Sequence, residues 1–104
     1  RIYPATINSP AEYRLATSVA EQLVGFDNVV SNLEPSMGSE DFSFMLKEKP
    51  GAYLRLGQGE QGPDGVGGVG SNFLHNSCYD FNDSVLPLGA ALFAGIVERS
   101  MPLA

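Results

Sequence analysis

The sequence predicts an α/β fold, with about three helices packed on a few strands. Three stretches that begin near Ser9, Ser39 and Ser84 carry apolar residues at helical spacing. Between them, Val29 and Val30 favour extended structure, and residues 52–56 form a short run that is apolar apart from Arg55. Helices that alternate with short strands are typical of a layered α/β architecture.

The first element is expected to be extended, over residues 1–8, and to lead into a helix. Ser9 is a good N-cap, Pro10 suits the first helical position, and Glu12 completes a capping box. Gly25 should end this helix, because glycine readily adopts the conformation that terminates one.

A second helix is expected to begin at Ser39. Glu40 and Asp41 would lie in its first turn, where the helix dipole favours negative charge. Pro50–Gly51 should end it, and a strand over residues 52–56 should follow.

The last third of the chain is expected to contain a loop, a short strand and a helix. Residues 57–70 hold seven glycines and predict the loop, and residues 72–74 predict the strand. The helix should run from about Ser84 to Arg99, with Asp83 or Ser84 as its cap. It is apolar almost all round, so we expect most of it to be buried and a further segment to cover it.

Composition excludes several classes of partner. Twelve acidic residues oppose six basic ones in 104 residues, giving a net charge of −6 without a basic cluster. Nucleic acid and anionic membrane surfaces are therefore not expected partners. No apolar stretch is long enough to cross a bilayer. The single cysteine cannot form an internal disulfide, which fits a reducing, cytoplasmic location.

The glycine-rich segment contains a motif that resembles a dinucleotide fingerprint. Gly57, Gly59 and Gly62 have the G-x-G-x-x-G spacing after a predicted strand. The fingerprint also needs a helix to begin there, and Pro63 followed by more glycine prevents this. A plain loop is the preferred interpretation.

The only histidine and the only cysteine lie three residues apart, at His75 and Cys78. Catalytic zinc sites usually take three protein ligands, so His75 could supply only part of a metal site. A hydrogen-bonded structural histidine explains the same residue at least as well. A cysteine hydrolase is a further alternative, with His75 as the base and Asp80 or Asp83 orienting it.

Three other polar residues admit both structural and functional explanations. Glu40 and Asp41 would stabilise the N-terminus of a helix, or contact a ligand or a metal-bound residue. Asn8 follows an extended apolar segment and would ordinarily be a turn residue.

Four motifs taken together indicate a family. In chain order they are Tyr3-Pro4-Ala5-Thr6-Ile7-Asn8, Met37-Gly38-Ser39-Glu40-Asp41-Phe42-Ser43-Phe44, Pro50-Gly51-Ala52-Tyr53-Leu54-Arg55-Leu56-Gly57 and Leu74-His75-Asn76-Ser77-Cys78-Tyr79-Asp80-Phe81-Asn82-Asp83. Over nearly its whole length the chain resembles the C-terminal part of the metal-dependent amidohydrolases related to hippurate hydrolase, aminoacylase and the indole-acetyl-amino-acid hydrolases.

The resemblance implies a fold and a domain organisation. These enzymes have a zinc-exopeptidase-like α/β catalytic domain that binds two divalent metal ions, with a smaller lid domain inserted into it. Residues 1–8 would then be the end of the lid, and residues 9–104 the C-terminal part of the catalytic domain, incomplete without upstream sequence.

The resemblance also implies residue roles. His75 matches the last metal ligand, and Asn8 matches an asparagine at the end of the lid that faces the substrate. Glu40 and Asp41 match a motif beside the metal site, where they would support the metal-bound residues. The general base and the other ligands would lie upstream. Cys78 has no metal role, because relatives often carry proline there.

The expected parent protein is a hydrolase of the amide bond of N-acyl amino acids or small peptides, with two zinc, manganese or cobalt ions. The chain alone would be inactive and would bind metal weakly or not at all. Its expected partners are an N-acyl amino acid substrate, the upstream half of the same polypeptide and possible further copies in a homo-oligomer. The alternative is a non-catalytic α/β module that self-associates or binds a protein through its apolar C-terminal helix.

Overall fold

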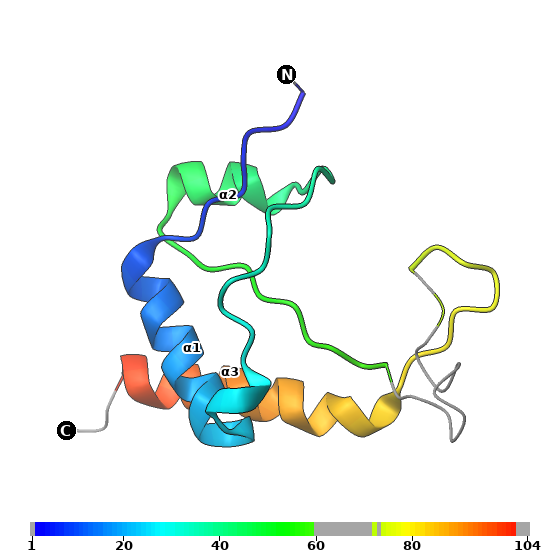
Figure 1. The fold of residues 1–104 in the computed structure, drawn as a ribbon. Helices are drawn as coiled ribbons and strands as arrows, with labels where there is room; N and C mark the ends of the chain where they lie inside the picture. The colour runs from blue at the N-terminus through cyan, green and yellow to red at the C-terminus, as the bar shows by residue number, and fades with distance from the viewer. Residues whose placement is uncertain (1, 60–71, 73, 102–104) are drawn as a thin grey trace. The chain divides into compact units, whose positions relative to one another are not determined.

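The computed structural model describes residues 2–59, 72 and 74–101 of the chain (Figure 1). The regular elements in this part of the chain are α1 (Pro10–Val24), η1 (Phe26–Asn28), α2 (Phe42–Glu48), η2 (Asp83–Val85) and α3 (Leu86–Ser100). The chain divides into two compact units, Arg1–Leu54 with Ala91–Ala104, and Arg55–Ala90.

The predicted α/β class is wrong for the described residues, which contain helices and no strand. The segments predicted as strands over residues 29–30 and 52–56 have no regular structure, and neither have residues 2–8. The strand predicted over residues 72–74 includes residue 73, which lies outside the described part. The loop predicted over residues 57–70 lies outside it from residue 60 onward.

Side-chain hydrogen bonds replace a strand ladder where two extended segments meet. Asn8 Oδ1 accepts from the Tyr53 N–H at 2.8 Å, and Asn8 Nδ2 donates to the Tyr53 carbonyl at 3.1 Å. Next to this pair, the Ser9 N–H donates to the Gly51 carbonyl at 2.9 Å, while Ser9 Oγ accepts from the Gly51 N–H at 3.1 Å. A strand needs successive backbone pairs, and here side chains satisfy the same groups.

The first predicted helix is confirmed in position, although its cap differs in detail. Ser9 is the N-cap residue, with an extended backbone, and Pro10 occupies the first turn. The expected capping-box bond is absent, because the Ser9 hydroxyl binds Gly51 instead. Gly25 ends the helix with φ of 85°, and its N–H donates to the Glu21 carbonyl at 2.9 Å.

The second helix is shorter than predicted, since α2 begins at Phe42 rather than Ser39. Asp41 is its N-cap residue, and the carboxylate of the preceding Glu40 accepts from the Phe42 N–H at 3.1 Å. Ser43 is fully buried, and its hydroxyl donates to the Glu40 carbonyl at 2.7 Å. The bond from Phe42 satisfies an N–H group at the start of the helix that has no partner within the helix.

The third helix lies where the sequence predicts it, but it is not buried. The 3-10 turn η2 leads into it, and Asn82, one residue before the predicted cap Asp83, caps that turn. Asn82 Oδ1 accepts from the N–H of Ser84 at 3.1 Å. No residue of α3 is buried, and Phe93 and Val97 are 70% and 51% exposed. An apolar helix needs other elements on several sides, and the described residues supply few of them. No helix in the described part is long and apolar enough to cross a membrane.

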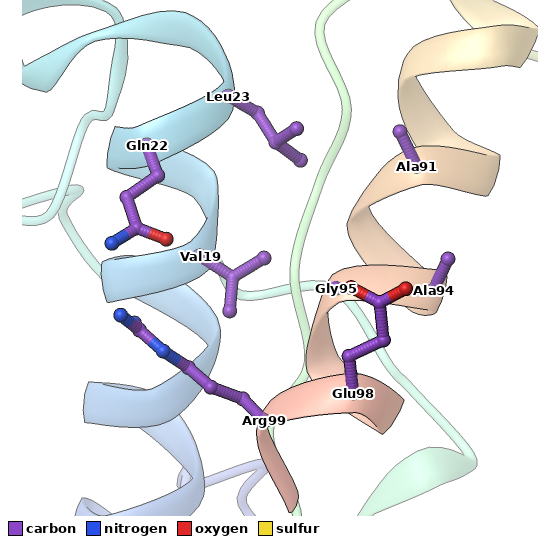
Figure 2. Close-up of a pocket in the computed structure, with 8 residues that line it drawn as sticks. All are labelled: Val19, Gln22, Leu23, Ala91, Ala94, Gly95, Glu98 and Arg99. Atoms are coloured by element: carbon purple, nitrogen blue, oxygen red, sulfur yellow. The ribbon is translucent and has the colours of Figure 1, made fainter. Parts of the chain in front are cut away.

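The small core of the first unit lies where α1 meets the C-terminal part of α3. Val19 of α1 is 4% exposed, and Arg99 Nη1 donates to Ser18 Oγ at 2.7 Å. Gly95 permits this close approach, because a Cβ atom there would lie 2.7 Å from Val19 Cγ1. Figure 2 shows Val19 pointing toward α3 and Arg99 reaching toward α1.

We predict that Gly95→Ala lowers the free energy of unfolding by about 1–2 kcal/mol, since overpacking at Val19 outweighs the gain in helix propensity. Gly89→Ala is the matched control on α3, because its Cβ would meet Leu56 Cδ2 at an ordinary 3.4 Å. This control should be stabilised by up to about 1 kcal/mol. Urea denaturation measures both, and equal stabilisation of the two variants would contradict the packing at Val19.

Candidate functional site

His75 lies on an exposed turn of the second unit and has an unusual backbone conformation. Its φ of 73° makes it the one non-glycine residue with positive φ in the described part of the chain. The left-handed conformation costs an ordinary residue about 1–2 kcal/mol. Such strain persists where surrounding contacts hold it, and it is enriched at functional sites.

Hydrogen bonds within the turn hold the segment that follows His75. Asn76 Oδ1 accepts from the Cys78 N–H at 2.8 Å, and the Asn76 carbonyl accepts from the Tyr79 N–H at 3.0 Å. Asn72 Nδ2 donates to the Cys78 carbonyl at 2.9 Å. The backbone of Cys78 and Tyr79 is therefore held by three hydrogen bonds.

A second set of hydrogen bonds joins this turn to the start of η2. Gln58 Nε2 donates to the Tyr79 hydroxyl, and Gln58 Oε1 accepts from the Asn82 N–H at 3.3 Å. Asn82 Nδ2 donates to the Gln58 carbonyl at 3.1 Å, and Asn82 is only 7% exposed. We call Gln58, Tyr79 and Asn82 the amide network.

The sequence alone does not predict the amide network. Gln58 lies within the glycine-rich segment, and Tyr79 and Asn82 lie within the fourth family motif, where nothing marks them as partners. A buried asparagine has to satisfy several donors and acceptors, but a linear sequence does not reveal the partner 24 residues away. The one sequence signal for the network is Gln58 between Gly57 and Gly59. Glycines supply no apolar packing there, so hydrogen bonds of the Gln58 amide are expected to hold the segment.

This turn carries one side chain, that of His75, that could ligate a divalent cation. The His75 side chain is exposed, and no described residue forms a hydrogen bond or ion pair with it. A neutral imidazole nitrogen is a common metal ligand, so the residue fits that role. Within the described ranges no group of three or more histidine, cysteine or acidic residues could hold a metal ion. His75 therefore fits as one ligand of a site that needs others.

The cysteine-hydrolase alternative receives no geometric support. Cys78 is exposed, and its Sγ lies 4.0 Å from Ser77 Oγ. Within the described part of the chain no hydrogen bond joins Cys78 to His75, or His75 to Asp80 or Asp83. A thiol nucleophile needs its base within hydrogen-bond reach.

The other predicted site residues lie in the first unit. The Asn8 amide pairs with the backbone of Tyr53, whose ring packs at 5.7 Å from that of Phe42. Phe42 in turn donates its N–H to Glu40. Asn8 and Glu40 thus belong to one connected set of contacts, and Asp41 is exposed beside it without a side-chain cap bond.

These observations give Asn8 and Glu40 structural roles that do not test their predicted roles near a substrate or metal-bound residue. His75 belongs to the other unit, so its proximity to Asn8, Glu40 and Asp41 stays a prediction.

A pocket lies elsewhere in the first unit, between α1 and α3. It has a volume of about 440 Å³. Its lining residues are Val19, Gln22, Leu23, Ala91, Ala94, Gly95, Glu98 and Arg99 (Figure 2). None of the predicted site residues lines it, and its small apolar side chains are those expected where two helices pack incompletely.

Comparison with known proteins finds matches to one family of hydrolases. The sequence model of Peptidase family M20/M25/M40 matches residues 1–99. Hippurate hydrolase of Campylobacter jejuni is 34% identical over 98 residues, which are 94% of this chain and 23% of that protein. IAA-amino acid hydrolase ILR1-like 2 of Arabidopsis thaliana is 36% identical over 96 residues, which are 92% of this chain and 20% of that protein.

A relative with a peptidase name is also similar to this chain. Thermostable carboxypeptidase 1 of Saccharolobus solfataricus is 32% identical over 93 residues, which are 89% of this chain and 21% of that protein. The chain thus spans about a fifth of the length of these relatives. No solved structure matches the chain significantly.

We predict that Asn8→Ala lowers the free energy of unfolding by about 1–2 kcal/mol, because two hydrogen bonds to Tyr53 are lost. Asn32→Ala is the matched control at an exposed asparagine, and it should change stability by less than about 0.5 kcal/mol. Urea denaturation provides the measurement. Equal stability of both variants would show that the Asn8 amide does not hold the two segments together.

Proposed function

Because this chain belongs to Peptidase family M20/M25/M40, we propose that it is the C-terminal part of a metal-dependent hydrolase. The substrate class that we propose is the amide bond of N-acyl amino acids, with small peptides as the second possibility. The names of the relatives support this range, since they include a hippurate hydrolase, IAA-amino acid hydrolases and carboxypeptidases. The family match over residues 1–99 is the observation that carries the proposal.

His75 is the residue that we propose as a metal ligand. Its imidazole is exposed on a turn held by hydrogen bonds on its C-terminal side. The proposed pair of divalent ions, zinc, manganese or cobalt, would activate water and polarise the scissile carbonyl. The described residues contribute one ligand, so we expect this chain alone to bind such ions weakly and to lack activity.

We propose the remaining roles on the same basis. Residues 1–8 would be the end of an inserted lid, and residues 9–104 part of the catalytic domain. Asn8 would place the end of the lid by its pairing with Tyr53, and Glu40 would fix the start of α2 beside the metal site. Asp41, whose side chain is exposed, would support a metal-bound residue from outside this chain.

The exposed apolar residues of α3 support a partner surface. Phe93 and Val97 are more than half exposed on a helix with no buried residue. We propose that the upstream part of the same polypeptide covers them. A non-catalytic module that self-associates through α3 would use the same residues, but the family match favours the first explanation.

His75→Ala in the complete protein should lower the rate of metal-dependent hydrolysis of N-benzoylglycine by more than about a hundredfold. Removing a residue that only supports a metal ligand typically costs about 10–100-fold in activity, and removing the ligand itself should cost more. Release of glycine from N-benzoylglycine, in the presence of Mn²⁺ or Zn²⁺, is the measurement. Circular dichroism should show an unchanged fold, since the side chain is exposed.

Cys78→Ala is the matched control on the same turn and should retain activity, because the thiol has no assigned role. Full activity of His75→Ala would overturn the ligand assignment. Loss of activity in both variants, with metal binding unchanged in His75→Ala, would favour the cysteine-hydrolase alternative instead, because His75 is the base there.

Phe93→Ala should lower the free energy of unfolding of the complete protein by about 3 kcal/mol, as expected for a phenylalanine that becomes buried. A side chain that stays 70% exposed would give a change within about 0.5 kcal/mol. Denaturant unfolding separates these values. The smaller change would contradict the proposal that α3 is covered by the rest of the polypeptide.

A further inference from the structure

Gln58 connects two segments of the second unit that are far apart in sequence. Its amide binds the Tyr79 hydroxyl on one side and the Asn82 N–H on the other. Its backbone carbonyl accepts a further bond from Asn82 Nδ2 at 3.1 Å. Gln58 and Tyr79 are half-buried and Asn82 is buried, so water competes little for these bonds.

The same bonds lead directly to the turn that carries His75. The Tyr79 N–H donates to the Asn76 carbonyl at 3.0 Å, and Asn76 is the residue after His75. The Tyr79 ring is also fixed, because it packs edge-on against Phe81 at 4.9 Å. Gln58 thus holds the side chain of Tyr79, and the backbone N–H of Tyr79 closes the turn.

We expect the backbone conformation of His75 to depend on the bond between Gln58 and Tyr79. With φ of 73°, the residue is in a region that non-glycine residues avoid. If Tyr79 were released, the turn could relax to negative φ and carry the imidazole elsewhere. A ligand has to be held close to its productive position, so such a shift would weaken metal binding.

We propose that Gln58 is a positioning residue, which fixes the Tyr79–Asn76 turn so that His75 is presented to a divalent cation. This inference rests on the proposed function, because it takes His75 as a metal ligand. It assigns a role to a residue that is neither the predicted metal ligand nor the predicted substrate-facing residue.

The test uses Gln58→Met in the complete protein, which removes the amide at nearly constant size. We expect Mn²⁺ to bind about 10–100-fold more weakly, as for other residues that orient a ligand. Competition with a metal indicator gives the Mn²⁺ dissociation constant. Modification of the His75 peptide by diethyl pyrocarbonate, followed by mass spectrometry, should show that Mn²⁺ protects His75 in the unaltered protein but not in Gln58→Met.

Gln58→Glu should restore Mn²⁺ affinity, since a carboxylate can accept from both the Tyr79 hydroxyl and the Asn82 N–H. Gln22→Met, at an exposed glutamine of α1, is the matched control and should leave affinity unchanged. A purely structural role would lower the unfolding temperature of the metal-free protein without changing the affinity of the folded fraction.

Each outcome bears on a different statement. Loss of Mn²⁺ affinity in His75→Ala but not in Gln58→Met would overturn the positioning role and leave the proposed function intact. Unchanged affinity in His75→Ala would overturn the ligand assignment and the positioning role together. If Gln58→Met does not fold, Tyr79→Phe removes only the hydroxyl at one end of the same contact, and unchanged affinity there would overturn the proposal.

Discussion

Amide side chains hold together the non-helical segments of this chain. Asn8 pairs with the backbone of Tyr53, Asn76 closes the turn after His75, and Gln58 binds Asn82. A carboxamide offers a donor and an acceptor in the same plane, as a peptide group does. It can therefore satisfy backbone groups that would otherwise need a neighbouring strand. The positions of Asn8 and of the His75 turn depend on these bonds.

The helices show how much of the fold the sequence predicts. Ser9, Pro10 and Gly25 are local signals, and α1 accordingly lies where they place it. The start of α2 differs by three residues, since the Glu40 carboxylate binds the N–H of Phe42, the first helical residue, whereas the sequence pattern favours a start at Ser39. Helix ends are set by short-range hydrogen bonds, so errors there stay small.

The strands could not be predicted in the same way, because a strand is defined by its partner. Residues 52–56 form a short apolar run that the sequence presents as a strand, yet Tyr53 binds a side chain and no ladder forms in the described part of the chain. The amide network was missed for a related reason, since its contacts join Gln58 to residues more than 20 positions away. Non-local hydrogen bonds leave no periodic trace in a sequence.

The environment of His75 bears on both explanations of this residue, a structural histidine and the metal ligand that we propose. A structural histidine is expected to be packed or hydrogen-bonded through its ring. Here the side chain is exposed without a hydrogen bond from any described residue, while the backbone around it is tightly bonded and strained. The left-handed backbone of His75 therefore costs conformational free energy. Its side chain forms no interaction within the described part of the chain that offsets this cost. A ligand contributed to a shared metal site would account for that cost, because the compensating interaction would come from the cation and its other ligands.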